Sequence, residues 1–335
     1  MTSSSKPSVG KEGEIRSGSL AGKTMWGAIC FLAIPILIQQ ILIACVGLAD
    51  KILAGALPNS IVLPAMDAIG IGSYIGWFIA IAVSGVGIGA QALIARAMGG
   101  GHLADGHKVL GQSMTLAFFW GCIVGAALYV FAAPLGDLCQ LSVEAKNYLV
   151  QYIQVLAIGM PACSVMTTGA MALHGSGDTL RPAIVTVFVN IVNVVCSWVL
   201  SGADVRMGES TIENPFAWDM HVVGIAIGTS IAYIVGGILI VCVLARGVKD
   251  LRLQLRDLIP DFSLFIRIAK IGIPNFFEGL SMWLANLFVL QFIGQIAAGM
   301  AIELDGDEPV VEGLQGAHVI AVQWEAFSFL PGFAI

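Results

Sequence analysis

Long uncharged runs dominate this sequence and constrain its fold more than any other feature. Each run can cross the hydrocarbon core of a bilayer as a helix, which takes about 20 residues. Only 11% of the 335 residues are charged and 57% are hydrophobic, whereas soluble domains carry about 25% charged residues. The sequence therefore predicts an all-α, polytopic membrane protein surrounded by lipid. The runs cover 25–49, 68–95, 109–136, 147–173, 182–203, 222–245 and 264–302, and an eighth begins near Gly316.

The basic residues predict how these spans are oriented. With the N-terminus in the cytoplasm, the loops on that side and the tail hold thirteen of the 16 Lys and Arg residues, and the outer side holds three, Lys51, Lys146 and Arg206. Such an excess is typical of cytoplasmic loops. We therefore expect a multi-pass protein of the cell inner (plasma) membrane, N-terminus inside, with the acidic loop 303–312 outside. The net charge of −6 argues against a nucleic-acid partner.

The chain divides into four predicted parts. Residues 1–24 form a cytoplasmic tail, 25–245 a lobe of six transmembrane helices, 246–263 a cytoplasmic linker, and 264–335 the first two helices of a second lobe. The linker has the pattern of an amphipathic helix lying along the membrane surface. Pro35 and Gly55 of the first run recur as Pro274 and Gly294 in the seventh, both displaced by 239 positions. A parallel repeat of six helices is a common plan of secondary transporters.

The sequence contains no phosphate-binding loop, no zinc-binding spacing and no Ser/His/Asp set. We therefore expect no enzyme, no ATP site, no metal centre and no cofactor. What remains are ionisable residues inside membrane spans, which are rare and indicate a functional site. They are Asp50 at the end of the first span, Glu278 in the seventh and Glu325 in the eighth. The structural alternatives are an interfacial anchor for Asp50 and a structural hydrogen bond for Glu325.

Neutral polar residues gather on the fifth and sixth spans. Asn193 and Ser197 are four residues apart and share a helix face, and Thr229 lies on the next span. Such groups line a cavity or form hydrogen bonds between helices. The turn at Asp178 and Thr179 is explained by capping of the helix that follows.

The sequence resembles the multidrug and toxic compound extrusion (MATE) family of secondary transporters. The matching stretches occur in family order: Ile34-Pro35, Gly47-Leu-Ala-Asp50, Ala54-Gly55, Gly89-Ala-Gln91, Ala95-Arg96, Gly175-Ser-Gly-Asp-Thr179 with Pro182, Asn193, Gly224 with Gly228-Thr229, Ile271-Gly-Ile-Pro274 with Glu278, and Ala317-His318. They cover residues 26–335.

The resemblance implies twelve helices in two lobes and a central cavity that opens to either side in turn. It also implies export of small organic, often cationic, compounds in exchange for H⁺ or Na⁺. Asp50, Asn193 and Thr229 would line the cation site of the first lobe, and Glu278 would belong to the second. Na⁺ at Asp50 or at Glu278 is the alternative to a proton. One departure is Ser197, which stands where many prokaryotic members have an aspartate.

Three other interpretations follow from the sequence. A lipid-linked oligosaccharide flippase of the same superfamily would need cationic residues in its cavity, and an intramembrane enzyme would need a catalytic dyad or metal ligands. The third is a fragment that does not transport. The second repeat supplies only two helices, so the six-helix plan predicts that about 140–150 residues are lacking. If the chain is such a fragment, we expect it alone to bind the organic compound weakly and not to transport it.

Overall fold

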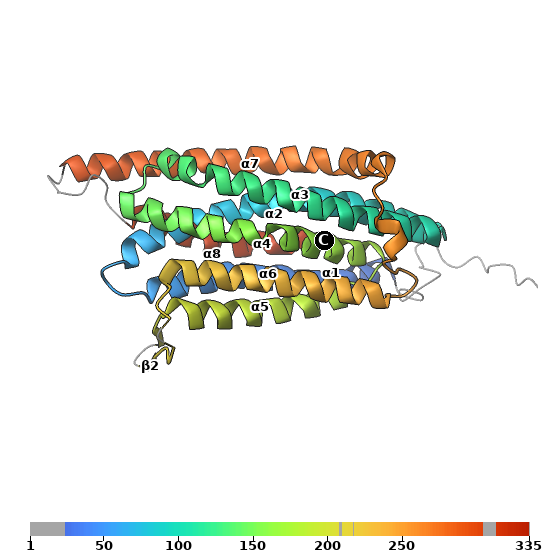
Figure 1. Ribbon diagram of the computed structural model, residues 1–335, viewed down its shortest axis with the longest axis horizontal. Helices are drawn as coiled ribbons and strands as arrows, with labels where there is room; N and C mark the ends of the chain where they lie inside the picture. Colours follow the sequence, from blue (N-terminus) through green and yellow to red (C-terminus); the bar gives the residue numbers. More distant parts are fainter. Residues whose placement is uncertain (1–23, 208–209, 217, 304–312, 335) are drawn as a thin grey trace, which may run out of the picture.

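The computed structural model describes residues 24–207, 210–216, 218–303 and 313–334. Within them the chain forms eight α-helices and one antiparallel pair of strands. Figure 1 shows the helices side by side along the long axis of the molecule. The helices are α1 (Met25–Gly55), α2 (Val62–Gly99), α3 (Leu103–Leu138), α4 (Val143–Gly175), α5 (Leu180–Ser201), α6 (His221–Arg246), α7 (Phe262–Glu303) and α8 (Leu314–Ala334), and the strands are β1 (Val205–Met207) and β2 (Ser210–Ile212).

The predicted membrane spans are confirmed as helices. In the described part of the chain, seven helices, α1 to α7, are long and apolar enough to cross a membrane. The protein is therefore a multi-pass membrane protein. Several helices continue past the predicted spans, and α1 runs to Gly55 rather than ending at residue 49. Asp50 and Lys51 do not end it because both are buried against neighbouring helices instead of meeting lipid.

Local chemistry sets several helix ends. The hydroxyl of Thr24 accepts a hydrogen bond from the amide of Gly27 at the start of α1, and Ser142 does the same for Ala145 in α4. The predicted cap before α5 is confirmed: Asp178 Oδ1 accepts from the amides of Leu180 and Arg181, each at 3.2 Å. Such side-chain acceptors satisfy amides that have no partner within the helix.

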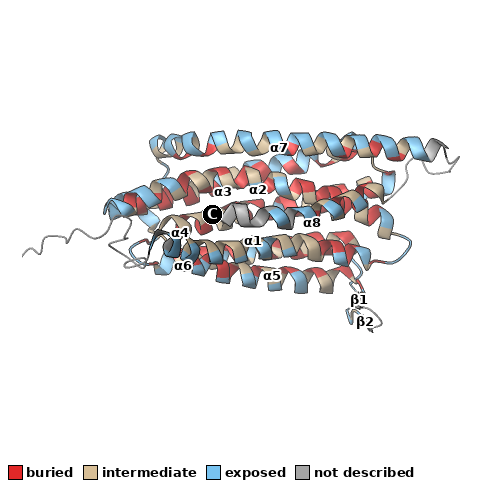
Figure 2. Ribbon diagram, turned by 180° about the vertical axis from the view of Figure 1, so that it is seen from behind, coloured by how far each residue is buried: buried red, intermediate tan, exposed pale blue. Residues whose placement is uncertain are grey.

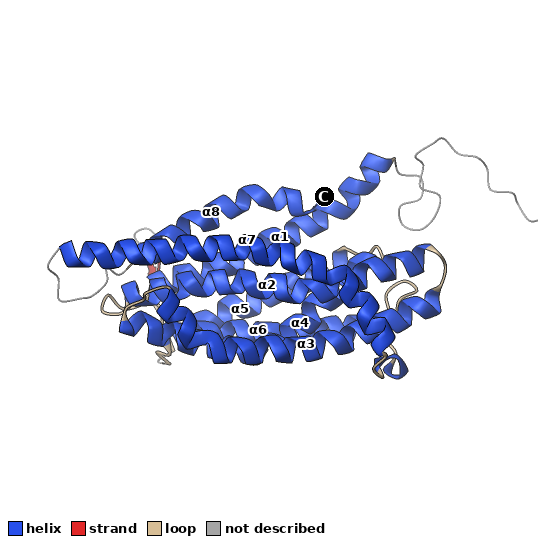
Figure 3. Ribbon diagram, turned by 90° about the horizontal axis from the view of Figure 1, so that it is seen from above, coloured by secondary structure: helices blue, strands red, loops and turns tan. Residues whose placement is uncertain are grey.

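Helix α2 lies at the centre of the bundle. It packs against α1, α3, α4, α7 and α8. The contact with α7 is close because glycines face it: a Cβ atom added to Gly272 would collide with the carbonyl of Gly85. Small residues allow such approach between membrane helices. Figure 2 shows that α7 leaves an exposed face away from α2, whereas Figure 3 shows α8 beside α1.

The segment between α6 and α7 differs from the predicted amphipathic helix. Only Leu255–Leu258 is helical, as a single 3₁₀ turn. The reason lies in α3, whose Gln112 donates to the carbonyls of Asp257 and Ile259, both at 2.6 Å. These carbonyls are thus occupied by α3. Lys108 of α3 also pairs with Asp261 at 2.7 Å, and this hydrogen bond lowers the pKa of the Asp261 carboxyl.

Two predictions concern residues outside the described part of the chain. The predicted cytoplasmic tail corresponds to residues 1–24, of which 1–23 are not described. The acidic loop falls on 303–312, of which only Glu303, at the end of α7, is described.

Candidate functional site

Asp50 lies inside α1 and is buried, with 5% of its surface exposed. Asp50 is therefore packed against neighbouring helices. Its carboxylate interacts with the hydroxyls of Thr229 on α6 and Tyr152 on α4. One carboxylate oxygen, Oδ1, is buried without a hydrogen-bond partner. An unsatisfied carboxylate oxygen is costly in a membrane interior, so this atom is suited to receive a proton or a cation.

The predicted polar residues of α5 and α6 meet beside Asp50. Asn193 Nδ2 donates to Thr229 Oγ1 at 2.9 Å, and Thr229 donates to the carbonyl of Ile225 at 3.1 Å. Asn193 is 1% exposed and its Oδ1 has no partner. The cluster therefore holds two buried acceptor oxygens, on Asp50 and Asn193, that the protein itself does not satisfy. Oxygen ligands of this kind suit a proton or a hard cation.

Ser197 lies between α5 and α6, beside the other polar residues. It is fully buried, and its hydroxyl donates to the carbonyl of Ile225 at 3.2 Å. Glycines bring α6 this close to α5, since a Cβ atom added to Gly228 would collide with Ser197 and one added to Gly224 would meet the backbone of Leu200. Ser197 therefore ties the two helices together next to the cluster, and Asp50 is the carboxylate there.

Glu278 and Glu325 lie apart from this cluster. Both are exposed, and neither is among the groups that interact with the Asp50 carboxylate. Glu325 on α8 instead interacts electrostatically with Tyr74 on α2, whose hydroxyl lies 3.3 Å from His318 Nε2. The structure thus brings Asp50, Asn193, Ser197 and Thr229 together and leaves the two glutamates on the side formed by α7 and α8.

Two buried charges escaped the sequence analysis. Lys51 is 4% exposed and Asp67 is 3% exposed, although the sequence placed Lys51 in an outer loop and Asp67 just before a span. Asp67 Oδ2 accepts from the amide of Gly313 at 2.7 Å and Oδ1 from that of Gly316 at 2.8 Å. It therefore caps α8 from α2. One feature of the sequence could have indicated their burial: both residues directly adjoin apolar runs.

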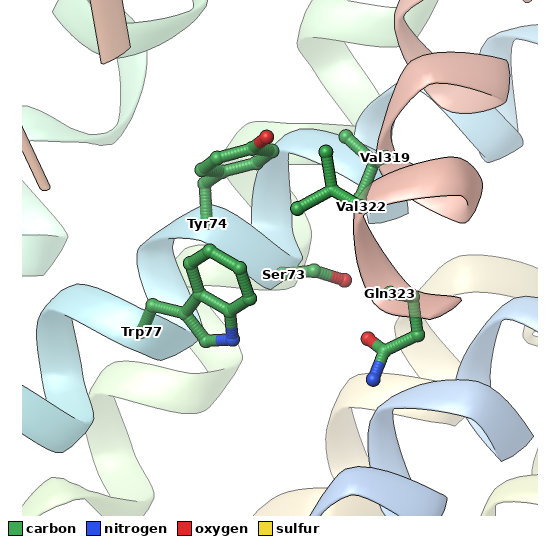
Figure 4. A pocket seen from close by; sticks show the side chains of 6 residues that line it. All are labelled: Ser73, Tyr74, Trp77, Val319, Val322 and Gln323. Atoms are coloured by element: carbon green, nitrogen blue, oxygen red, sulfur yellow. The ribbon is translucent and has the colours of Figure 1, made fainter. Parts of the chain in front are cut away.

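Two pockets lie elsewhere among the described residues. One, of about 230 Å³, lies between α1 and the ends of α2 and α4, and another, small and narrow, lies between α2 and α8 (Figure 4). Neither is lined by a carboxylate. Within the same residues no group of three His, Cys, Asp or Glu side chains converges.

Comparisons with known proteins agree with this architecture. The MatE family model matches residues 35–199. The probable multidrug resistance protein NorM of Thermotoga maritima is 26% identical over 306 residues, which are 91% of this chain and 59% of that protein. The multidrug export protein MepA of Staphylococcus haemolyticus is 22% identical over 275 residues, 81% of this chain and 56% of that protein.

Solved structures show the same fold. A MATE crystal structure in the bent conformation superimposes with a TM-score of 0.71 at 22% identity, and an outward-facing MATE family transporter of the MOP superfamily with 0.68 at 22%. Each match covers 92% of this chain and 62% of the solved one. The chain thus spans about 60% of the length of the relatives it matches. The chain belongs to the MatE family, the multidrug and toxic compound extrusion proteins that its sequence resembles.

Proposed function

We propose that the protein acts as a secondary antiporter, in which Asp50 exchanges a coupling cation, H⁺ or Na⁺, against a small organic compound that is often cationic. The observation that carries this proposal is the buried carboxylate of Asp50, whose Oδ1 lacks a partner inside a membrane helix. The family membership and the names of the multidrug relatives support transport rather than catalysis.

The exchange follows from charge. One carboxylate in a poorly solvated site holds one positive charge, because a second cation would meet an already neutralised group. A proton or Na⁺ and a cationic compound therefore compete for Asp50. Transport results if the two loaded forms prefer different arrangements of the helices, since a ligand shifts a conformational equilibrium by its differential affinity.

The neighbours of Asp50 have distinct proposed roles. Asn193 offers its unpartnered Oδ1 as a second oxygen for the cation, and Thr229 fixes the amide of Asn193 by accepting its hydrogen bond. Ser197 keeps α5 and α6 in register. Glu278 and Glu325 belong to a second site on α7 and α8.

The domain plan and the orientation remain part of the proposal. Helices α1 to α6 form the first lobe, and α7 and α8 open the second. The thirteen-to-three asymmetry of basic residues supports a cytoplasmic N-terminus in the plasma membrane. A flippase of lipid-linked oligosaccharides is not favoured, because the cluster presents a carboxylate and the buried Lys51 beside it already has two hydrogen-bond acceptors.

Binding of ethidium, a fluorescent organic cation, to the purified chain in lipid nanodiscs tests this function. We expect added Na⁺ or acidification to displace ethidium, and Asp50→Asn to abolish that displacement. Asp137→Asn is the matched control, because Asp137 is an exposed carboxylate paired with Lys146 at the end of α3, and it should behave as the parent. Ethidium binding that is indifferent to both cations, or unchanged in Asp50→Asn, would contradict the proposal.

A further inference from the structure

Lys51 is a buried lysine within a membrane helix that the function proposed above does not use. It follows Asp50 directly, and consecutive residues of a helix point in different directions. Asp50 accordingly faces Tyr152 on α4 and Thr229 on α6, whereas Lys51 contacts α8. Helix α1 therefore lies between the cation cluster and α8, with Asp50 facing the cluster and Lys51 facing α8.

The contact between Lys51 and α8 is specific. Lys51 Nζ donates to Gln323 Oε1 at 3.0 Å and to the carbonyl of Gly47 at 3.2 Å. Gln323 is 7% exposed, and Figure 4 shows its amide extending away from Val319 and Val322, at the edge of the pocket between α2 and α8. A Cβ atom at residue 47 would lie 3.4 Å from Gln323 Oε1, so this amide packs directly against α1 at Gly47.

The ammonium of Lys51 also acts on Asp50 through space. It is the cation among the described groups that interact with the Asp50 carboxylate. The other titratable groups facing Asp50 are the hydroxyls of Tyr152 from α4 and Tyr233 from α6, and both are neutral when protonated. A nearby positive charge weakens the binding of a further cation, and the effect depends on its distance and on the low dielectric of the site.

Helix α8 is held to the first three helices by polar contacts at separate points. Besides Gln323, its Gln315 donates to the carbonyl of Cys139 at the end of α3, at 2.6 Å, and Asp67 caps its first turn. Apolar packing adds to these contacts, because Val319 is buried in the core formed with the first helices, while polar contacts between membrane helices contribute modestly. Because Lys51 donates to Gln323, a movement of α8 would take this partner away from the ammonium.

We propose that Lys51 is a positioning residue that makes the cation affinity of Asp50 depend on the docking of α8. While α8 is docked, Gln323 and Gly47 hold the ammonium away from Asp50 and a cation can bind there. When α8 moves away, the ammonium loses Gln323 and turns toward the nearest anionic group, the Asp50 carboxylate, which expels the cation. This inference rests on the proposed function of Asp50 and adds the residue that links it to α8.

A double-mutant cycle on the purified full chain in nanodiscs tests the inference. Dicyclohexylcarbodiimide modifies protonated carboxyl groups in apolar surroundings, and mass spectrometry quantifies the adduct on Asp50. Labelling is followed against Na⁺ at fixed pH and against pH in Na⁺-free buffer, which gives the half-saturating concentration of the coupling cation. Lys51→Met should lower this concentration by at least about tenfold, because one unit charge within about 10 Å at an effective dielectric of about 20 has an effect of that size or larger.

Gln323→Leu should raise the half-saturating concentration in the parent by roughly three- to tenfold and change nothing in the Lys51→Met background, because its effect passes through the lysine. Lys51→Arg keeps the charge and should keep the dependence on Gln323. Ser328→Ala is the control on the same helix: the exposed hydroxyl of Ser328 donates to the carbonyl of Glu325 within α8 itself, so its loss should leave both the docking of α8 and the cation affinity unchanged.

The outcomes separate the inference from the function on which it rests. Cation-dependent labelling of Asp50 with equal effects of Gln323→Leu in the parent and in the Lys51→Met background would overturn the inference alone. Labelling of Asp50 that responds to neither cation would overturn both. If Lys51→Met fails to fold, the comparison of Gln323→Leu with Ser328→Ala decides, because equal affinities in these two variants also contradict the role of Lys51.

Discussion

Asp67 should be the strongest single attachment of α8 to the first helices. Its two carboxylate oxygens accept from the amides of Gly313 and Gly316 at 2.7 and 2.8 Å, and the side chain is buried. Hydrogen bonds to a charged group contribute about 1.5–3 kcal/mol each in soluble proteins. Side-chain hydrogen bonds in a membrane protein average only about 0.6 kcal/mol and reach about 1.7. Loss of a helix cap costs about 1 kcal/mol.

The hydrogen-bond energies measured in membrane proteins are the ones to use for the cost of Asp67→Ala, because α8 lies within the helical bundle. Two bonds near their upper limit, made by a carboxylate at a helix N-terminus, give about 2–3 kcal/mol for Asp67→Ala. The local opening of α8 should become more frequent by about 30- to 150-fold, since 1.4 kcal/mol is a factor of ten. Hydrogen exchange of the α8 amides, followed by mass spectrometry in nanodiscs, measures this opening directly.

The reasoning is refuted if Asp67→Ala speeds exchange in α8 by less than about threefold. Asp137→Asn serves as the control at the same end of the bundle. Asp137 pairs with Lys146, and its side chain is 66% exposed, so this change should cost well under about 1 kcal/mol. Asp67→Asn, which keeps one acceptor oxygen, should fall between the two.

Three further predictions concern the cluster and the packing around it. Thr229→Val removes the acceptor of Asn193 and should cost about 1–2 kcal/mol of unfolding free energy, measured by detergent-induced unfolding, together with weaker cation protection of Asp50. Gly272→Leu collides with the carbonyl of Gly85 and should separate α7 from α2, lowering the thermal unfolding midpoint. Glu278→Gln should leave the cation affinity of Asp50 unchanged, because Glu278 is exposed and does not interact with it.

Each of these predictions has a control variant or a result that would contradict it. Ser230→Ala removes a hydroxyl next to Thr229 that donates to the carbonyl of Val155 on α4, so it should lower stability without changing cation protection. Gly299→Leu adds a side chain to α7 where nothing lies within 4 Å and should be neutral. Equal behaviour of Gly272→Leu and Gly299→Leu would show that the α2–α7 contact is not close. A changed affinity in Glu278→Gln would show that the two acidic sites interact.

The spans and part of the cluster could be predicted from the sequence because polar backbone and charged side chains are energetically costly inside a membrane. Long apolar runs leave a membrane helix as the favourable structure, and Asp50 within such a run needs polar neighbours. Asn193 and Thr229 are among the polar residues of the fifth and sixth spans, and they do meet. The sequence could not show that Ser197 would be used between α5 and α6, since that depends on the approach allowed by Gly228.

The rest depends on tertiary contacts that have no local pattern. Lys51 and Asp67 look like residues of a loop because each adjoins the end of an apolar run, whereas both are buried and both form hydrogen bonds to α8 or its first turn. The linker reads as an amphipathic helix because Leu255 and Ile259 are four residues apart. Its conformation is decided instead by Gln112 of α3, which binds its carbonyls.

Release of the coupling cation on binding of ethidium tests the central claim most directly. Ethidium is added to the purified chain in weakly buffered nanodiscs, and released protons are read by a pH indicator or released ²²Na⁺ by filtration. Competition for one carboxylate predicts on the order of one cation released for each ethidium bound, and none in Asp50→Asn. Ethidium binding without release, or equal release in Asp50→Asn, would contradict the account.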